Sequence, residues 1–228
     1  MASEAILPSA HFYLLDKQNE GKHDTEFSRT SSNFGPALRC PQCGGIIGSL
    51  SWEPPYQGEL ELYGTDFGDL MDGPSGLIIT ERFAEDFKAK GLTGLSGFHP
   101  VEVKKVRHRG GRGPKPGPPP NYLYVTLAYG QPALDLARSR ILTKKPATCT
   151  WCRYAGPDAI DGLFLEEGTW NGEDVFRPRG MWGIVLVSER FKRFAERHAM
   201  SHMALIPIEK YVWDPLGILP PHQQPSDG

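Results

Sequence analysis

Two stretches of the chain repeat one order of apolar and polar positions. Residues 76–83 are Gly-Leu-Ile-Ile-Thr-Glu-Arg-Phe, and residues 184–191 are Ile-Val-Leu-Val-Ser-Glu-Arg-Phe. The apolar run predicts a buried strand. Thr80 and Ser188 are natural N-caps, because each hydroxyl can accept a hydrogen bond from a free N–H of the first helical turn. Each stretch therefore predicts a strand that leads into a capped, amphipathic helix.

The match extends to both sides of these stretches. Residues 99–103 after the first helix resemble residues 206–210 after the second, and both predict a strand. A Cys-x-x-Cys pair lies upstream of each helix, 40 positions from Cys40 to Thr80 and 39 from Cys149 to Ser188. The pattern predicts an α+β fold of two related strand-helix-strand halves joined at a four-cysteine zinc site. The alternative is coincidence, since a strand followed by a capped helix is a common motif.

This pattern predicts four segments. Residues 10–107 form the first repeat, with an N-terminal strand near 12–15 and the first cysteine pair. Residues 108–120 are basic and rich in glycine and proline, which predicts an exposed loop. A nucleic-acid-binding arm and an SH3-type ligand are alternatives to a plain connector. Residues 121–212 form the second repeat, opening with a strand at 121–128, and residues 213–228 form a flexible tail.

Composition narrows the class of protein. The chain has 228 residues, 39% hydrophobic and 23% charged, which is typical of a globular protein with a real core. A net charge of −2 gives no general attraction to nucleic-acid phosphates. No segment approaches the roughly 18 apolar residues of a membrane helix, and the first residues lack the features of a signal peptide. We therefore expect a soluble, cytoplasmic protein, where reduced cysteines favour metal binding over disulfides.

The four cysteines are the candidate metal ligands. Cys-Pro-Gln-Cys-Gly-Gly begins at Cys40, Cys-Thr-Trp-Cys begins at Cys149, and the chain has no other cysteine. Two residues between thiolates let both sulfurs reach one ion, so Cys40, Cys43, Cys149 and Cys152 predict a closed tetrahedral Zn²⁺ site of structural type. Iron is an alternative ion. A thioredoxin-like redox pair would need a thiol at a helix N-terminus, and no helical pattern follows either motif.

No set of residues typical of an enzyme is evident. His198 and His202 have the spacing of a metalloprotease helix, but Ala199 stands where that motif has glutamate. Ser188 and Ser201 lack the glycines of a nucleophile elbow. We therefore predict a protein that is not an enzyme.

Two acidic stretches are candidates for binding a basic protein. Residues 53–72 and 158–174 each hold six acidic residues and no Lys or Arg, and aromatic residues are interspersed. Aromatic anchors among carboxylates suit a protein interface, although a solvated acidic face is an equally simple interpretation. The predicted partner-binding residues are Trp52, Tyr63, Asp66, Phe67, Asp69, Asp72, Glu166, Glu167, Trp170, Glu173 and Asp174.

The arrangement resembles the double-CXXCG immunity proteins of myxobacteria. The likeness rests on Phe12-Tyr13, on Gly35-x-x-x-Arg39-Cys40-Pro41-x-Cys43-Gly44, on Cys149-x-x-Cys152, and on Val187-Ser188-Glu189-Arg190-Phe191. It covers roughly residues 10–211. The resemblance implies a protein that binds and neutralises a cognate toxin domain from kin cells. Arg153 follows the second pair where the family has glycine, so we expect the second turn to differ.

Two other functions stay open at this point. A zinc-ribbon nucleic-acid-binding module is favoured by the basic segment 104–115 and disfavoured by the net charge. A thiol oxidoreductase is the other alternative, in which a cysteine pair would react without removal of a metal.

Overall fold

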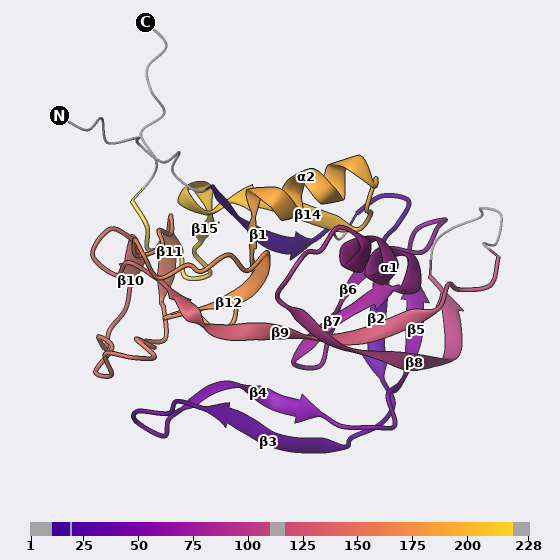
Figure 1. The fold of residues 1–228 in the computed structure, drawn as a ribbon, viewed down its shortest axis with the longest axis horizontal. Helices are drawn as coiled ribbons and strands as arrows, with labels where there is room; N and C mark the ends of the chain where they lie inside the picture. Colours follow the sequence, from indigo (N-terminus) through magenta and orange to yellow (C-terminus); the bar gives the residue numbers. More distant parts are fainter. Residues whose placement is uncertain (1–10, 19, 110–116, 221–228) are drawn as a thin grey trace, which may run out of the picture.

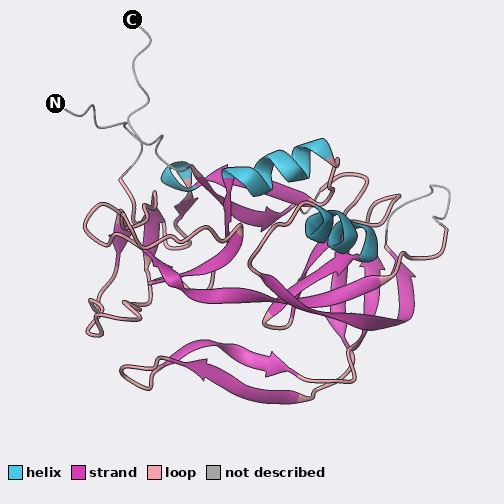
Figure 2. Ribbon diagram, in the orientation of Figure 1, coloured by secondary structure: helices cyan, strands magenta, loops and turns pink. Residues whose placement is uncertain are grey.

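The computed structural model describes residues 11–18, 20–109 and 117–220. Strands account for 43% of the described residues and helices for 10%. The sheet curls beneath the two helices (Figure 2). The predicted α+β class is therefore wrong, and this is a mostly β protein. The reason is that the helices are only nine residues each, whereas the segments around them form strands of up to 14 residues.

The strands are β1 (Phe12–Lys17), β2 (Thr25–Arg29), β3 (Phe34–Arg39), β4 (Ile46–Trp52), β5 (Gln57–Leu62), β6 (Leu70–Gly73), β7 (Gly76–Thr80), β8 (Leu95–His108), β9 (Tyr122–Ala133), β10 (Ile141–Leu142), β11 (Ala159–Asp161), β12 (Val175–Arg179), β13 (Leu186–Ser188), β14 (Met203–Pro207) and β15 (Val212–Trp213). The helices are α1 (Glu81–Ala89), α2 (Glu189–Arg197) and the short 3-10 helix η1 (Ile208–Lys210).

Ten of these strands form one mixed sheet. Its main path runs β14-β1-β13-β12-β9-β8-β5-β2, and β6 and β7 join it through β9. A three-stranded sheet, β10-β11-β15, lies at one end, and the hairpin β3–β4 lies apart below β8 and β9 (Figure 1). The first part of β9 pairs with β7 and β8, while its last part pairs in parallel with β12. This one long strand makes the sheet continuous.

The two predicted halves are therefore not separate units. Strand β1, from the first predicted half, pairs with β13 and β14 of the second. The surroundings of the two helices still match locally, because β1 runs between β13 and β14 as β9 runs between β7 and β8. In β9, Leu123 pairs with Pro100 of β8, and in β1, Tyr13 pairs with Pro207 of β14. The repeated motif thus lies at equivalent register positions of one sheet.

The predicted N-caps are confirmed. Thr80 Oγ1 accepts a hydrogen bond from the N–H of Phe83 at 3.3 Å, and Ser188 Oγ accepts one from the N–H of Phe191 at 3.1 Å. Both phenylalanines are fully buried, and Phe83 meets Phe194 of the other helix edge to face, with ring centroids 5.6 Å apart. The caps therefore orient two helices whose aromatic faces pack on each other above the sheet.

The other predictions of secondary structure are confirmed only in part. The strands predicted near residues 12–15 and at 121–128 are found as β1 and β9. The strand predicted at 206–210 instead begins at Met203 and gives way to η1, and α2 ends before His198. Residues 110–116 of the predicted loop and residues 221–228 of the predicted tail lie outside the described residues. Trp213 of the predicted tail lies in β15, where it pairs with Ile160 of β11. No described helix has the length and apolar character needed to cross a membrane.

Candidate metal centre

The four cysteine sulfurs converge on one point. All four Sγ atoms lie within 4.8 Å of one another. The Sγ atoms of Cys40 and Cys149 are 3.7 Å apart, and those of Cys43 and Cys152 are 3.9 Å apart. A tetrahedral ion with metal–sulfur bonds of about 2.3 Å needs sulfurs about 3.8 Å apart. The spacing fits such an ion and is far longer than a disulfide bond of about 2.05 Å.

The first knuckle is the turn between β3 and β4. The N–H of Cys40 donates to the carbonyl of Gly45 at 2.8 Å, and the N–H of Gly44 donates to the carbonyl of Cys40 at 2.9 Å. Gly44 has a φ of +71°, in the left-handed region that glycine adopts without strain. This turn brings the N–H of Cys43 to 3.5 Å from the sulfur of Cys40. Backbone N–H groups near both sulfurs suit ligands that bind as thiolates.

The second knuckle makes the same turn without a glycine. Arg153 has a φ of +52°, and its N–H donates to the carbonyl of Cys149 at 3.0 Å, as Gly44 does in the first knuckle. The expectation that this turn would differ is therefore wrong. The arginine side chain forms an ion pair with Glu166 and donates from Nη1 to the carbonyl of Leu134 at 3.1 Å. We attribute the tolerated left-handed conformation to these contacts, which hold the arginine in place.

The thiols differ in their affinity for protons. The N–H of Cys152 points at the sulfur of Cys149 and lowers the pKa of the Cys149 thiol to about 6. Burial raises the pKa of the Cys152 thiol to about 12. Four thiolates this close repel one another, and a divalent cation removes that repulsion. The donor set thus fits a sulfur-binding metal ion, which would supply a closed structural cross-link with no open position for a substrate.

The cross-link would join the β3–β4 hairpin to the main sheet. The second knuckle is attached to the end of β12, because Gly180 donates from its N–H to the carbonyl of Cys152 at 2.8 Å. Ile47 of β4 is 1% exposed and packs with Cys40 and Cys152. At the other end of the hairpin, Trp52 is buried in a core cluster with residues of β7 and β9. The hairpin is thus held at both ends, by apolar packing at one and by the cysteines at the other.

The fold and the cysteine cluster define a mostly β protein with a candidate four-sulfur metal centre. Comparison with protein-family models and with curated proteins gives no match. The family that the sequence resembles therefore supports a proposal about function and does not identify the chain.

Three of the predicted partner-binding residues lie inside the protein. Trp52, Asp69 and Asp174 are 2%, 6% and 1% exposed. Trp52 packs edge to face on Tyr124, with ring centroids 5.0 Å apart. A buried residue cannot contact a partner without unfolding its surroundings, so these three do not belong to a binding surface. The acidic pattern alone gave no sign of their burial.

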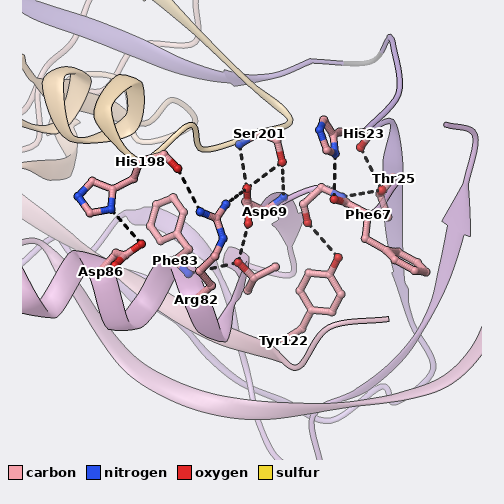
Figure 3. Close-up of polar contacts among 12 residues, drawn as sticks. His23, Thr25, Phe67, Asp69, Arg82, Phe83, Asp86, Tyr122, His198 and Ser201 are labelled. Atoms are coloured by element: carbon pink, nitrogen blue, oxygen red, sulfur yellow. Dashed lines mark hydrogen bonds and ion pairs between the residues drawn. The ribbon is translucent and has the colours of Figure 1, made fainter. Parts of the chain in front are cut away.

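Asp69 is the centre of a polar network between the two helices (Figure 3). Its carboxylate accepts hydrogen bonds from Thr80 Oγ1 at 2.8 Å and from Arg82 Nη2 at 2.6 Å. It also accepts from the N–H of Ser201 at 2.9 Å. Arg82 in turn donates to the carbonyl of His198, where α2 ends, at 3.0 Å. The network therefore ties the start of α1 to the end of α2.

Asp174 repeats this arrangement at the other helix. It accepts from Ser188 Oγ at 2.7 Å, from Arg190 Nη1 at 3.2 Å and from the N–H of Thr93 at 2.9 Å. Arg190 also donates to the carbonyl of Lys90 at the end of α1, at 2.8 Å. Each helix start is thus linked to the other helix end, and both aspartates are structural.

The other predicted partner-binding residues stay at or near the surface. Phe67 and Trp170 are half-buried and pack against core clusters. The others with at least partly exposed side chains are Tyr63, Asp66, Asp72, Glu166, Glu167 and Glu173. Strand β5 lies toward one end of the long axis and β11 lies toward the other (Figure 1). The two acidic stretches therefore both reach the helix pair, through the buried Asp69 and Asp174, but their strands β5 and β11 lie apart.

The sequence analysis did not identify a group of residues between the β3–β4 hairpin and the main sheet. Tyr129, Arg177 and Trp182 line a cavity there. They are far apart in the sequence and belong to no motif, so only the pairing of β9 with β12 brings them together.

Proposed function

We propose that the four cysteines hold one structural zinc ion. The support is the tetrahedral spacing of the four sulfurs, which Zn²⁺ favours. Metal analysis of the purified protein should give one zinc per chain. Cys43→Ser should lose the metal and destabilise the protein, while Ser49→Ala in the same hairpin should keep it. Iron at one equivalent, with thiolate-to-iron absorption, would refute the zinc assignment.

We propose that the protein is a non-catalytic immunity protein that neutralises a cognate toxin domain by binding it. The observation that carries the proposal is the meeting of two Cys-x-x-Cys knuckles at one site, together with the resemblance to double-CXXCG immunity proteins. Such a closed site has structural and no catalytic chemistry. Within the part of the chain that the structure describes, the four cysteines form the one cluster of three or more possible metal ligands. A binding role is consistent with that donor set.

The basic segment favours the nucleic-acid alternative less than its sequence suggests. Arg107 contacts Glu59 through its Nε at 2.8 Å, and Arg109 contacts Glu61 through Nη2 at 2.8 Å. Each of these arginine charges already lies beside a carboxylate of β5. They are therefore less available for phosphate groups.

The proposed partner surface consists of exposed residues of the first acidic stretch, after β5 and in β6. Tyr63 is 42% exposed and supplies an aromatic anchor. The Asp66 and Asp72 side chains are 53% and 71% exposed, and each lies near a lysine, at 3.7 Å and 3.9 Å. At such exposure these pairs contribute little to stability. The carboxylates are therefore free to exchange a lysine for a basic group of a partner.

Co-expression with a toxin domain encoded beside this gene tests the proposal. Wild-type protein should restore growth, and Asp66→Lys combined with Tyr63→Ala should restore it less at equal soluble yield. Glu167→Lys is the matched control, because its side chain is 94% exposed and belongs to the other acidic stretch. Equal killing with and without wild-type protein at normal soluble levels would refute the immunity function. Loss of protection only with Glu167→Lys would assign the partner surface to the second acidic stretch.

A further inference from the structure

The hydroxyl of Tyr129 is buried and has no hydrogen-bond partner among the described residues. The tyrosine packs against the cluster of Cys40, Ile47 and Cys152, and its hydroxyl lies by the sulfurs of the two cysteines. Buried polar groups in folded proteins are almost always hydrogen-bonded, so such an exception calls for an explanation. The sulfurs beside the hydroxyl are therefore the acceptors to consider.

Contacts with the sheet and with the second knuckle hold Tyr129 in this position. In β9 the residue pairs with Arg177 of β12. Its ring meets that of Trp151, which lies between the two cysteines of the second knuckle, with centroids 6.4 Å apart. The guanidinium of Arg179, also in β12, lies 5.5 Å from the centroid of the Trp151 ring and donates from Nη1 to the carbonyl of Trp151 at 3.4 Å. These contacts fix the tyrosine beside the cysteines.

Two of the four cysteines are closed off from solvent. Cys40 and Cys152 are 2% and 4% exposed, whereas Cys43 is exposed. Water can donate a hydrogen bond to a thiolate at the surface, but a buried thiolate depends on donors from the protein. N–H groups of Gln42 and Cys43 lie near the Cys40 sulfur, and the N–H of Tyr154 lies near the Cys152 sulfur. A further donor from the protein would therefore stabilise the buried pair, and Cys152 above all.

The Tyr129 hydroxyl keeps its proton at neutral pH and can act as that donor. Burial, with the sulfur charges of Cys152 and Cys40 as smaller causes, raises the pKa of Tyr129 to about 12. A neutral thiol accepts hydrogen bonds weakly, whereas an ionised acceptor forms bonds that are roughly twice as strong. Cysteines bind a metal ion as thiolates. The hydroxyl therefore gains a good acceptor when the cysteines hold a metal.

We propose that Tyr129 is a positioning residue of the metal centre, and that its hydroxyl donates a hydrogen bond to the buried thiolates of Cys152 and Cys40 in the metal-loaded protein. The bond would offset part of the negative charge that four thiolates bring together, and it would tie the second knuckle to β9. This inference rests on the proposed metal site. It is independent of the immunity proposal, because it concerns how tightly the metal is held and not the surface that a partner contacts.

Metal titrations of full-length wild type and Tyr129→Phe test the proposal. Competition with a chromophoric chelator should show that the variant binds zinc about tenfold more weakly. In the cobalt-loaded variant the sulfur-to-cobalt absorption should move to longer wavelength, because thiolates without the hydrogen bond hold their electrons less tightly. Wild-type protein that binds neither zinc nor cobalt would refute the metal site itself. Equal zinc affinities and an unchanged cobalt band in the two proteins would instead refute the role of Tyr129 alone.

Tyr124→Phe is the matched control, because it removes another buried hydroxyl from β9. The Tyr124 hydroxyl shares a hydrogen bond with Ser75 Oγ at 2.9 Å, so its loss should lower the thermal midpoint while zinc affinity and the cobalt band stay as in the wild type. Tyr129→Phe should show the opposite pattern in the chelated protein, with a thermal midpoint that is unchanged or higher, and a lower midpoint only with metal bound. Equal lowering of the midpoint with and without metal would show that Tyr129 acts by packing, which contradicts the proposal.

Discussion

Asp69→Asn should destabilise the protein strongly, although it removes only a charge from an acidic stretch. The Asp69 side chain is 9% exposed and accepts hydrogen bonds from Thr80, from Arg82 and from two groups of Ser201. The Asn amide offers one acceptor oxygen, and its NH₂ group would face N–H and O–H donors. The substitution therefore leaves buried donors unpaired as well as breaking bonds.

The expected loss in the free energy of unfolding follows from these contacts. A hydrogen bond to a charged group contributes about 1.5–3 kcal/mol, and unpaired buried groups cost a similar amount. The Arg82 side chain is 52% exposed, so its ion pair with Asp69 is screened and contributes less than a buried pair. Because the bonds share one carboxylate, they are not additive. We expect a loss of about 3 kcal/mol, which lowers the urea midpoint by about 1 M.

Urea denaturation followed by tryptophan fluorescence measures this loss. Asp66→Asn is the matched control, since it makes the same chemical change three residues away at a side chain that is 53% exposed. It should cost less than about 0.5 kcal/mol. Asp174→Asn, at the equivalent network of the other helix, should cost as much as Asp69→Asn. Midpoints for Asp69→Asn and Asp66→Asn that agree within error would refute the network argument.

Three further predictions concern the turns and the metal. Arg153→Gly should change the free energy of unfolding by less than about 1 kcal/mol, because relief of the left-handed conformation offsets the lost side-chain contacts. Arg153→Val should cost more than about 1 kcal/mol, because a β-branched residue is strained in that conformation. Thermal or urea unfolding measures both changes. Gly94→Ala should lower soluble yield sharply, since an added Cβ would lie 1.8 Å from the carbonyl oxygen of Val175; Gly21→Ala, with a similar φ and open space, should be mild. The metal should be released to a chromophoric chelator as pH falls from 7.5 to 5: binding keeps thiol pKa values low, so its stabilisation is present at high pH and lost on acidification. A metal content that does not change over this range would contradict the thiolate ligand set.

Local chemistry was predictable from the sequence alone. The N-caps at Thr80 and Ser188 and the Cys-x-x-Cys knuckles depend on atoms within three residues of each other, so spacing along the chain determines their geometry. The meeting of the two knuckles was also predictable, because four cysteines in matched pairs have one economical arrangement. The turn at Arg153 was not, because its conformation depends on contacts with residues distant in the sequence.

Tertiary structure decided the rest. The sequence showed Asp66 and Asp69 as similar members of one acidic stretch, and only packing against the other helix buried Asp69. The fold class followed from strand pairing, since β1 inserts between β13 and β14 more than 170 positions along the chain. The cavity between the β3–β4 hairpin and the main sheet likewise depends on the pairing of β12 with β9. Burial and register arise from contacts between distant residues, which local patterns of hydrophobicity and charge do not specify.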